Sequence, residues 1–268
     1  MDIITHALSG VAIGSVFIHS SRKKKRFSAC ILLVSGLGAV LPDIDVISLW
    51  SGFDSTFGQW FNLPLSGKEI YSAKLWYSHH AFFHSLLAAA FFTIVLAGFI
   101  ALRQKIITRS PHFSMRLLLQ RKGILLLSFF LAYVMHLFQD MLTPAASWGG
   151  VAFLWPLLDY SGGWGYIWWW NNYDIFLIVC SIITLNLFLW LVPMASQRIR
   201  FAIAGGVLLA GILMASKQLA MRDNNYNYSK EKGYQYLEQE SLIEQKQVLG
   251  EYGYNLMIRI DRSLPVYF

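Results

Sequence analysis

Six long apolar stretches separated by short polar loops limit how this chain can fold more than any other feature. They cover residues 3–19, 27–41, 81–102, 123–142, 175–195 and 201–218. A helix of about 17 to 25 apolar residues crosses the roughly 30 Å hydrocarbon core of a bilayer. The composition agrees, because the chain is 56% hydrophobic and only 14% charged, whereas soluble proteins are about one quarter charged. We therefore predict an all-α fold, a polytopic transmembrane helical bundle of about six spans.

Positive charge alternates between the loops, and this alternation predicts the orientation. Cytoplasmic loops of membrane proteins are enriched in Lys and Arg. Thirteen basic residues and no acidic residue lie in the loops at 20–26, 103–122 and 196–200. The loops at 42–80 and 143–174 contain only Lys68 and Lys74 as basic residues. We predict a multi-pass protein of the bacterial inner membrane whose termini and whose loops at 42–80 and 143–174 face the extracytoplasmic side.

The net charge and the cysteines exclude some classes of protein. The formal charge is +7, but the basic residues form short runs between apolar stretches, so no nucleic-acid partner is predicted. Cys30 and Cys180 both fall inside apolar stretches, which excludes a CxxC site and predicts packing residues. Tryptophans in the loop 143–174 favour an interfacial belt in contact with membrane lipids over rings that stack on a substrate.

The last 50 residues differ in character from the rest of the chain. Residues 219–268 mix acidic and basic side chains with several tyrosines and contain no long apolar run. We predict two parts, a membrane-embedded helical domain at 1–218 that carries the functional site and a small polar extracytoplasmic tail at 219–268. The tail has weak helical periodicity around 238–249 and a strand-like pattern at 255–260.

Ionisable residues gather at one end of the predicted spans. Such a group at the bilayer centre costs roughly 2.5–3.5 kcal/mol by insertion scales, so each one needs a physical reason. Under the predicted orientation, five separate segments bring them to the outer ends of the helices, whereas His19 and His112 lie on the other side. The residues are His6, Asp43, Asp45, His79, His80, His84, His136, Asp140 and Asp174.

The spacing of these residues predicts part of their geometry. His136 and Asp140 are four residues apart and share a helical face, as do His80 and His84. Asp43 and Asp45 follow a proline at the end of a span, so they are expected on the same side of an extended segment. Imidazole and carboxylate ligands without thiolates suit a divalent ion, with zinc, manganese and iron as candidates.

Each feature also has a simpler interpretation when taken alone. His6 fits an interfacial helix end, and Asp43 with Asp45 fits a helix cap or a solvated loop. His136 and Asp140 fit an intramembrane hydrogen-bonded pair. The arrival of several such groups at one side of the membrane favours a metal centre over these interpretations.

Several short motifs occur in an order that resembles a known family. The motifs are Thr5-His6-Ala7-Leu8, Leu41-Pro42-Asp43-Ile44-Asp45, His79-His80-Ala81-Phe82-Phe83-His84-Ser85-Leu86, His136-Leu137-Phe138-Gln139-Asp140 and Leu154-Trp155-Pro156. Over about residues 1–175 the chain resembles the YdjM-like (DUF457) family of membrane-bound metal-dependent hydrolases. In that family the third motif usually reads His-Arg-Gly-x-Ser/Thr-His-Ser, so His80 stands here in place of the arginine, with Ala81 and Phe83 as the other departures. We favour His79 as the ligand, with His80 as the alternative.

The resemblance implies metal-assisted hydrolysis at the extracytoplasmic interface. The implied metal ligands are His6, Asp43, Asp45, His79, His84, His136 and Asp140, with Asp45 and Asp140 as the catalytic candidates for the general base and a spare histidine as the alternative. These seven exceed the ligands of one zinc ion, so either two ions share carboxylates or some residues orient the others. Asp174 is a further candidate.

The substrate class follows from a more distant likeness and from position. The histidine and aspartate pattern is similar to that of zinc-dependent phospholipase C and single-strand nucleases, which implies a phosphoester, and the position at the membrane favours a lipid-linked one. A non-catalytic metal-binding protein, a metal transporter and a haem-linked carrier are the alternatives. The transporter is disfavoured by the apolar inner halves of the spans, and the haem carrier by the neighbouring aspartates.

Overall fold

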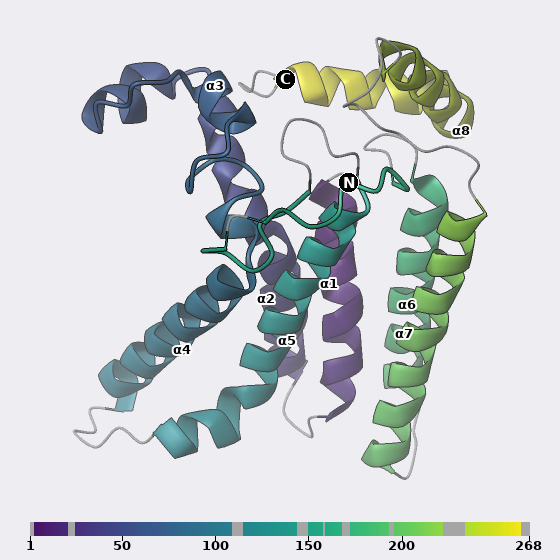
Figure 1. Cartoon of the computed structure of the whole chain (residues 1–268). Coiled ribbons are helices and arrows are strands. Elements are labelled where there is room, and N and C mark those ends of the chain that lie inside the picture. The colour runs from purple at the N-terminus through teal and green to yellow at the C-terminus, as the bar shows by residue number, and fades with distance from the viewer. Residues whose placement is uncertain are drawn as a thin grey trace.

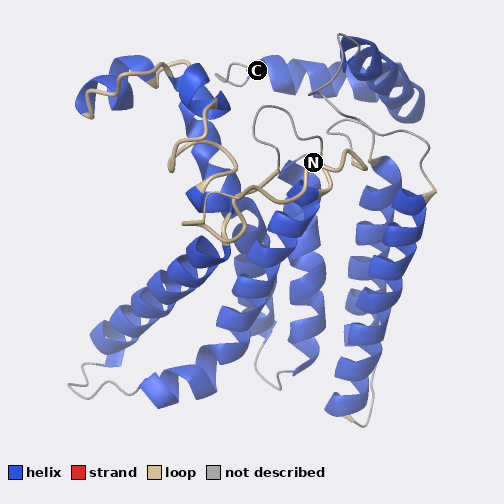
Figure 2. Cartoon of the chain, viewed as in Figure 1, coloured by secondary structure: helices blue, strands red, loops and turns tan. Residues whose placement is uncertain are grey.

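The computed structural model of the chain is an all-helical bundle (Figures 1 and 2). It describes residues 3–20, 25–108, 115–143, 150–157, 159–167, 172–192, 196–221 and 234–263. Within these ranges every named element is a helix, and an isolated bridge pairs Val151 with Ser161. The predicted all-α class is confirmed.

Six of the helices are long and apolar enough to cross a membrane. They are α1 (Ile3–Phe17, continued by the 3-10 turn η1, Ile18–Ser20), α2 (Lys25–Val40), α4 (Leu86–Thr108), α5 (Met115–Met141), α6 (Tyr173–Leu191) and α7 (Gln197–Ala220). Their large apolar side chains are exposed in many places, as expected where lipid surrounds a bundle. The six predicted spans are confirmed, with ends that shift by several residues.

The start of α4 corrects one expectation about the histidines. The helix begins at Leu86 and not at residue 81, because the Ser85 hydroxyl accepts the backbone N–H of Ala88 at 3.1 Å and so caps the first turn. The three histidines of this segment precede the helix. His80 lies in a turn with φ of +63°, and His84 ends the 3-10 turn η4 (Phe82–His84). The prediction that His80 and His84 share a helical face is therefore wrong.

The segment after α2 is also more compact than expected. Residues Leu41–Leu49 form the 3-10 helix η2, with Pro42 in its first turn, where a proline needs no backbone donor. Asp43 and Asp45 therefore lie on a tight helix and not on an extended segment. Their side chains still reach the same ring, because Asp43 lies 3.6 Å from His84 Nε2 and Asp45 lies 3.1 Å from His84 Nδ1.

Small residues let α1, α2 and α5 pack closely against one another near the end of the bundle that carries the ionisable residues. A methyl group added at Gly10 of α1 would overlap the backbone of Ser35 in α2. One added at Gly38 of α2 would lie 2.7 Å from the Phe129 carbonyl oxygen of α5. Close backbone approach through small residues is a common way for membrane helices to pack. These three helices are therefore fixed against one another at the end where the ionisable residues lie.

The remaining spans flank this trio. The helix α4 packs on α5 through Ala88, Ala89, Phe129 and Tyr133, and the Tyr133 hydroxyl donates a hydrogen bond to the Phe83 carbonyl at 2.5 Å. The pair α6 and α7 packs against α1 through an aliphatic cluster that includes Ala12, Ile178, Val179 and Ile182. In Figure 1 the pair α6–α7 and the helix α4 lie on opposite sides of the trio.

Several shorter elements cover the end of the bundle where the chain starts. They include the π-helix η3 (Asp54–Gly58) and α3 (Gly67–Ser72), whose first turn is fixed by a capping box between Ser66 and Glu69. The helix α8 (Tyr234–Ser263), interrupted at Gly250, lies across the same end (Figure 1). The strand expected at 255–260 is wrong, because these residues are helical. The division into domains at residue 218 stays a prediction.

Candidate metal centre

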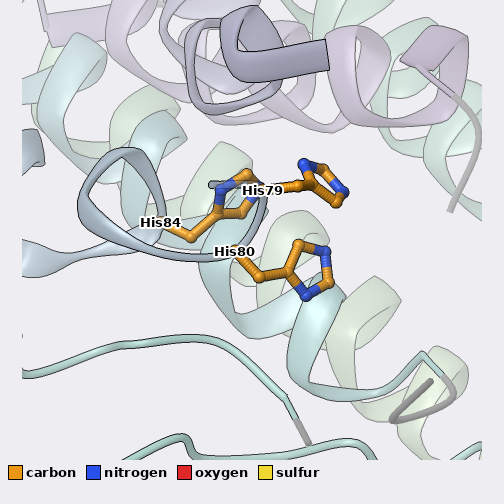
Figure 3. Close-up of side chains that lie close together, drawn as sticks. All are labelled: His79, His80 and His84. Carbon is orange, nitrogen blue, oxygen red and sulfur yellow. The ribbon is translucent and has the colours of Figure 1, made fainter. Parts of the chain in front are cut away.

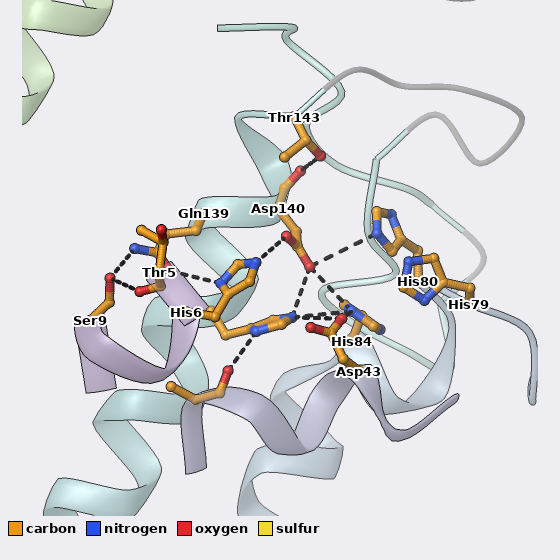
Figure 4. Close-up of polar contacts among 12 residues, drawn as sticks. Thr5, His6, Ser9, Asp43, His79, His80, His84, Gln139, Asp140 and Thr143 are labelled. Carbon is orange, nitrogen blue, oxygen red and sulfur yellow. Dashed lines mark hydrogen bonds and ion pairs between the residues drawn. The ribbon is translucent and has the colours of Figure 1, made fainter. Parts of the chain in front are cut away.

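Among the described residues, eight ionisable side chains from four segments meet at one end of α1, α2 and α5. Figure 4 labels six of them, His6, Asp43, His79, His80, His84 and Asp140. His6 comes from the first turns of α1, Asp43 and Asp45 from η2, and His136 and Asp140 from the last turns of α5. His79, His80 and His84 come from the segment before α4. Seven of the eight are buried, and the Asp43 side chain is the most accessible at 15%.

The Asp140 carboxylate lies at the centre of the cluster. Its Oδ2 atom is 2.8 Å from His136 Nε2, 3.2 Å from His84 Nε2 and 3.9 Å from His80 Nε2. Its Oδ1 atom is 3.2 Å from His6 Nε2. Four imidazoles from three segments of the chain therefore turn the same nitrogen, Nε2, toward one carboxylate.

Four of these side chains form a compact set of possible ligands. The Nε2 atoms of His84 and His136 are 3.3 Å apart, and Asp43 Oδ1 lies 3.6 Å from the first and 3.5 Å from the second. Together with Asp140, these residues each place one ligand atom within 4.8 Å of all the others. This is a set that could hold a metal ion.

Asp45 contacts two of the histidines at Nδ1. Its Oδ1 accepts a hydrogen bond from His79 Nδ1 at 2.7 Å, and its Oδ2 lies 3.1 Å from His84 Nδ1. This second contact is an ion pair without hydrogen-bond geometry, so both buried atoms remain without a hydrogen bond. Asp45 thus orients both rings, in the manner of the carboxylates that support metal-bound histidines.

A second group comprises His79, His80 and His84 (Figure 3). One nitrogen of each ring lies within 4.8 Å of the others. The ring centroids are separated by 4.2 Å between His79 and His80, 4.7 Å between His80 and His84, and 4.9 Å between His79 and His84. This second group shares His84 with the first.

Hydrogen bonds to the Nδ1 atoms determine where the lone pairs of several rings lie. His136 Nδ1 is 2.7 Å from the Ala39 carbonyl oxygen, and His80 Nδ1 is 3.0 Å from the Gly150 carbonyl oxygen. A carbonyl oxygen only accepts, so both Nδ1 atoms donate. A neutral ring then carries its lone pair on Nε2, the atom that faces Asp140.

The same deduction holds for His6 through a chain of hydrogen bonds (Figure 4). The Ser9 hydroxyl donates to the Thr5 carbonyl at 2.8 Å and accepts from Gln139 Nε2 at 2.7 Å. The Gln139 oxygen Oε1 must then be the atom that faces His6 Nδ1 at 2.9 Å, and it accepts that proton. His6 also keeps its lone pair on Nε2.

The cluster therefore needs a cation. Lone pairs of His6, His80 and His136 converge on a carboxylate that is itself rich in electron pairs, and two lone pairs in contact repel each other. Buried charges of one sign are not tolerated unless they are paired or coordinate a metal. Bound protons or a metal ion can meet this need, and the donor set of imidazoles and carboxylates suits a divalent ion.

Two of the histidines outside the spans, His80 and His84, differ in their affinity for protons. Burial, together with the adjacent His79 and His84, holds the pKa of His80 well below its usual value, so this ring is neutral at pH 7. Burial also lowers the pKa of His84, but Asp45, Asp140 and Asp43 outweigh it and raise the pKa well above its usual value. The carboxylates around His84 thus favour its protonated form.

Some predicted residues lie elsewhere. Asp174 is in the first turn of α6, where its carboxylate accepts the backbone N–H of Ile175 at 2.8 Å, and it belongs to neither ligand group. His19 is buried at the far end of α1, as expected, and Asp159 is exposed in a loop. His112 lies outside the described residues. Cys30 is exposed on α2, so the packing role expected for it is wrong.

Sequence reasoning missed the residues that orient the ligands. Gln139 was read only as part of a motif, and Thr5 and Ser9 were given no role. A signal was available, because a glutamine beside Asp140 inside an apolar span needs a buried partner. The carbonyl groups of Ala39 and Gly150 could not have been found, because every residue has a backbone carbonyl and residue type does not indicate which one accepts a hydrogen bond.

The opposite end of the bundle is also less apolar than expected. Asn186 Nδ2 in α6 donates to the Ser15 hydroxyl in α1 at 2.9 Å, and His19 Nε2 lies 3.1 Å from the Asn186 carbonyl oxygen. All three side chains are buried. Ala12 and Ile13, also buried, separate this inner polar cluster from Ser9 and the metal centre.

The fold and the site define a class, a polytopic α-helical membrane protein with a buried histidine and aspartate cluster at one end of its bundle. Residues 1–221 match the YdjM inner membrane protein family, a range that includes all six spans. The chain belongs to this family and is a multi-pass inner membrane protein. Searches of curated proteins and of solved structures found no match.

Proposed function

We propose that this protein is a metal-dependent hydrolase whose catalytic ion is held by Asp43, His84, His136 and Asp140. The observation that carries the proposal is the convergence of Nε2 lone pairs on Asp140, with the Nδ1 protons of three rings directed outward to acceptors. Supporting acceptors of this kind fix the tautomer of metal-bound histidines in proteins.

The spacing of the four ligand atoms supports this assignment. Zinc binds imidazole nitrogen and carboxylate oxygen at roughly 2.0–2.2 Å, so neighbouring ligand atoms of a tetrahedral site are about 3.3 Å apart. The contacts among Asp140 Oδ2, His84 Nε2, His136 Nε2 and Asp43 Oδ1 range from 2.8 to 3.6 Å. Zinc therefore fits, while manganese and iron accept the same donors.

The bound ion would lower the pKa of a water molecule and polarise the scissile group. Asp43 has the longest contacts and the most exposed side chain of the set, so substrate would approach on its side. The proton released by this water molecule would be held between Asp140 Oδ1 and His6 Nε2, which are 3.2 Å apart. Gln139 would hold His6 for this task, and Asp45 would orient His79 and His84. A direct catalytic role for Asp45 stays a second proposal.

A phosphoester, and specifically a lipid-linked one, is the substrate class we propose. The cluster lies at the ends of the spans, where a headgroup would meet it while the lipid chains remain in the bilayer. The connectors around it expose aromatic rings, among them Trp60 and Trp76, which suits the headgroup region. We further propose that this end of the bundle faces the extracytoplasmic side.

Two other functions fit the geometry less well. In a metal transporter the polar groups would continue across the membrane, but along α1 the apolar residues Ala12 and Ile13 lie between the two polar clusters. In a haem protein the two axial histidines would face each other across a porphyrin. The rings of His84 and His136 are only 5.2 Å apart, and both approach the Asp140 carboxylate.

Metal analysis of the purified protein, followed by a phosphoesterase screen, tests the proposal. We expect wild type to hold a stoichiometric divalent ion, and His136→Ala and Asp43→Ala to lose it along with any activity. His19→Ala, which removes a buried histidine at the other end, is the matched control and should keep the ion. Wild type that binds no metal under any loading condition would overturn the proposal.

Labelling of single cysteines tests the orientation. In a background with Cys30 and Cys180 replaced by serine, a cysteine at Ser20 should be protected from an impermeant reagent, and one at Ser161 should react from outside. The reverse pattern would place the site on the cytoplasmic side and leave the metal assignment intact.

A further inference from the structure

The first ion leaves part of the cluster unexplained. It uses Nε2 of His84 together with Asp43, His136 and Asp140, whereas His79 and His80 lie beside it and are equally buried. The rings of these two histidines are only 4.2 Å apart and tilted by 43°. Imidazoles packed this closely against a third imidazole and against carboxylates are typical of side chains that bind the same cation.

His80 is held in this position at a cost. Its φ of +63° lies in the left-handed region, which a residue with a Cβ rarely adopts. The surrounding structure enforces the turn, since His80 Nδ1 donates to the Gly150 carbonyl at 3.0 Å and the His80 carbonyl accepts from the Ala152 N–H at 2.8 Å. Strained backbone of this kind is concentrated at functional sites. The turn directs His80 Nε2 toward Asp140.

The charges of the cluster leave room for more than one cation. Asp43, Asp45 and Asp140 bring three negative charges into one buried cluster, and one divalent ion balances only two of them. The Oδ2 atom of Asp140 lies between the rings of the first group and His80. A carboxylate in such a place can serve two ions, and sites with two metals are common in enzymes that cleave phosphoesters.

We propose that His79 and His80 hold a second divalent cation beside the first, with the Asp140 carboxylate shared between the two ions. This inference rests on the proposed function, because it assumes the first ion. His84 keeps Nε2 for the first ion, since one nitrogen binds one metal, and its Nδ1 faces Asp45.

Metal stoichiometry measured on the full-length protein in detergent tests the inference. Wild type loaded with manganese and freed of excess metal should hold two ions per chain and show the exchange-coupled electron paramagnetic resonance spectrum of a manganese pair. His80→Asn should hold one ion and give the six-line spectrum of isolated manganese. Asparagine is chosen because it tolerates a positive φ, so the turn can persist.

Further variants distinguish the loss of a metal ligand from unfolding of the protein. His80→Gly relieves the backbone strain entirely and should also bind one ion, while His19→Asn, far from the cluster, should bind two. Asp140→Asn should lose both ions. A wild type that binds a single ion, or a His80→Asn protein that still binds two, would overturn the second site and leave the proposed function standing. A wild type that binds none would instead overturn the proposed function.

Discussion

Two buried polar clusters lie toward opposite ends of the same bundle, and they differ in what their burial requires. The inner cluster of Ser15, His19 and Asn186 consists of neutral groups that bond to one another and to backbone carbonyls. An unmatched atom there, such as Asn186 Oδ1, costs about 1–3 kcal/mol. The metal centre contains three carboxylates, and an uncompensated buried charge costs several kcal/mol. Only the metal centre therefore requires a cation.

The largest expected effect comes from the shared carboxylate. Asp140→Asn keeps the shape of the side chain but removes its charge, so metal affinity should fall by at least about 100-fold. In the metal-free protein, the same change should leave thermal stability unchanged or raise it, because one buried charge is gone. Thermal unfolding in detergent, with and without added metal, measures both effects.

The control for this prediction is Asp159→Asn, which changes an exposed loop residue. It should alter neither metal affinity nor stability. If metal-free Asp140→Asn were strongly destabilised, the carboxylate would have a structural role that no cation is needed to explain, and the contrast between the two clusters would weaken.

The next effect concerns the residue that orients His6. Gln139→Leu removes the acceptor of the His6 Nδ1 proton, so metal affinity or activity should fall by about 10- to 100-fold, the usual effect of losing such a support. Gln139→Glu restores an acceptor and should recover most of the loss. Isothermal titration with zinc measures the affinities.

The matched change at the inner cluster is Asn186→Leu, which also removes a buried amide that bonds to a serine. It should leave zinc affinity unchanged. A Gln139→Glu protein as weak as Gln139→Leu would show that the glutamine acts by packing alone and does not set the tautomer of His6.

The smallest effect is expected at the inner cluster itself. Ser15→Ala removes the acceptor of the Asn186 amide, and hydrogen bonds between membrane helices average about 0.6 kcal/mol, with a maximum near 1.7. We expect a loss of that size in unfolding free energy, equal with and without metal. A loss that appeared only in metal-loaded protein would mean that the two clusters are coupled across Ala12 and Ile13.

Helix formation illustrates how much of this protein is predictable from local sequence. The spans were located within a few residues because a membrane offers an apolar run few alternatives to a helix. The errors fell where tertiary contacts or caps decide the conformation. Residues 81–84 were assigned to a span, but the cap at Ser85 and the bond from His80 to Gly150 hold them outside α4. The segment 255–260 was read as a strand and is helical.

The sequence by itself determined the class of protein, the six spans and the chemical identity of the cluster, because hydrophobic length and residue type are local properties. It also indicated that the histidines and aspartates share one end of the bundle. Tertiary structure alone decided how they meet. The close packing at Gly10 and Gly38 brings α1, α2 and α5 together, and carbonyl and amide acceptors turn each Nδ1 outward. The direction of a lone pair depends on partners that are distant in the chain, so only the folded bundle shows that Asp140 lies at the centre.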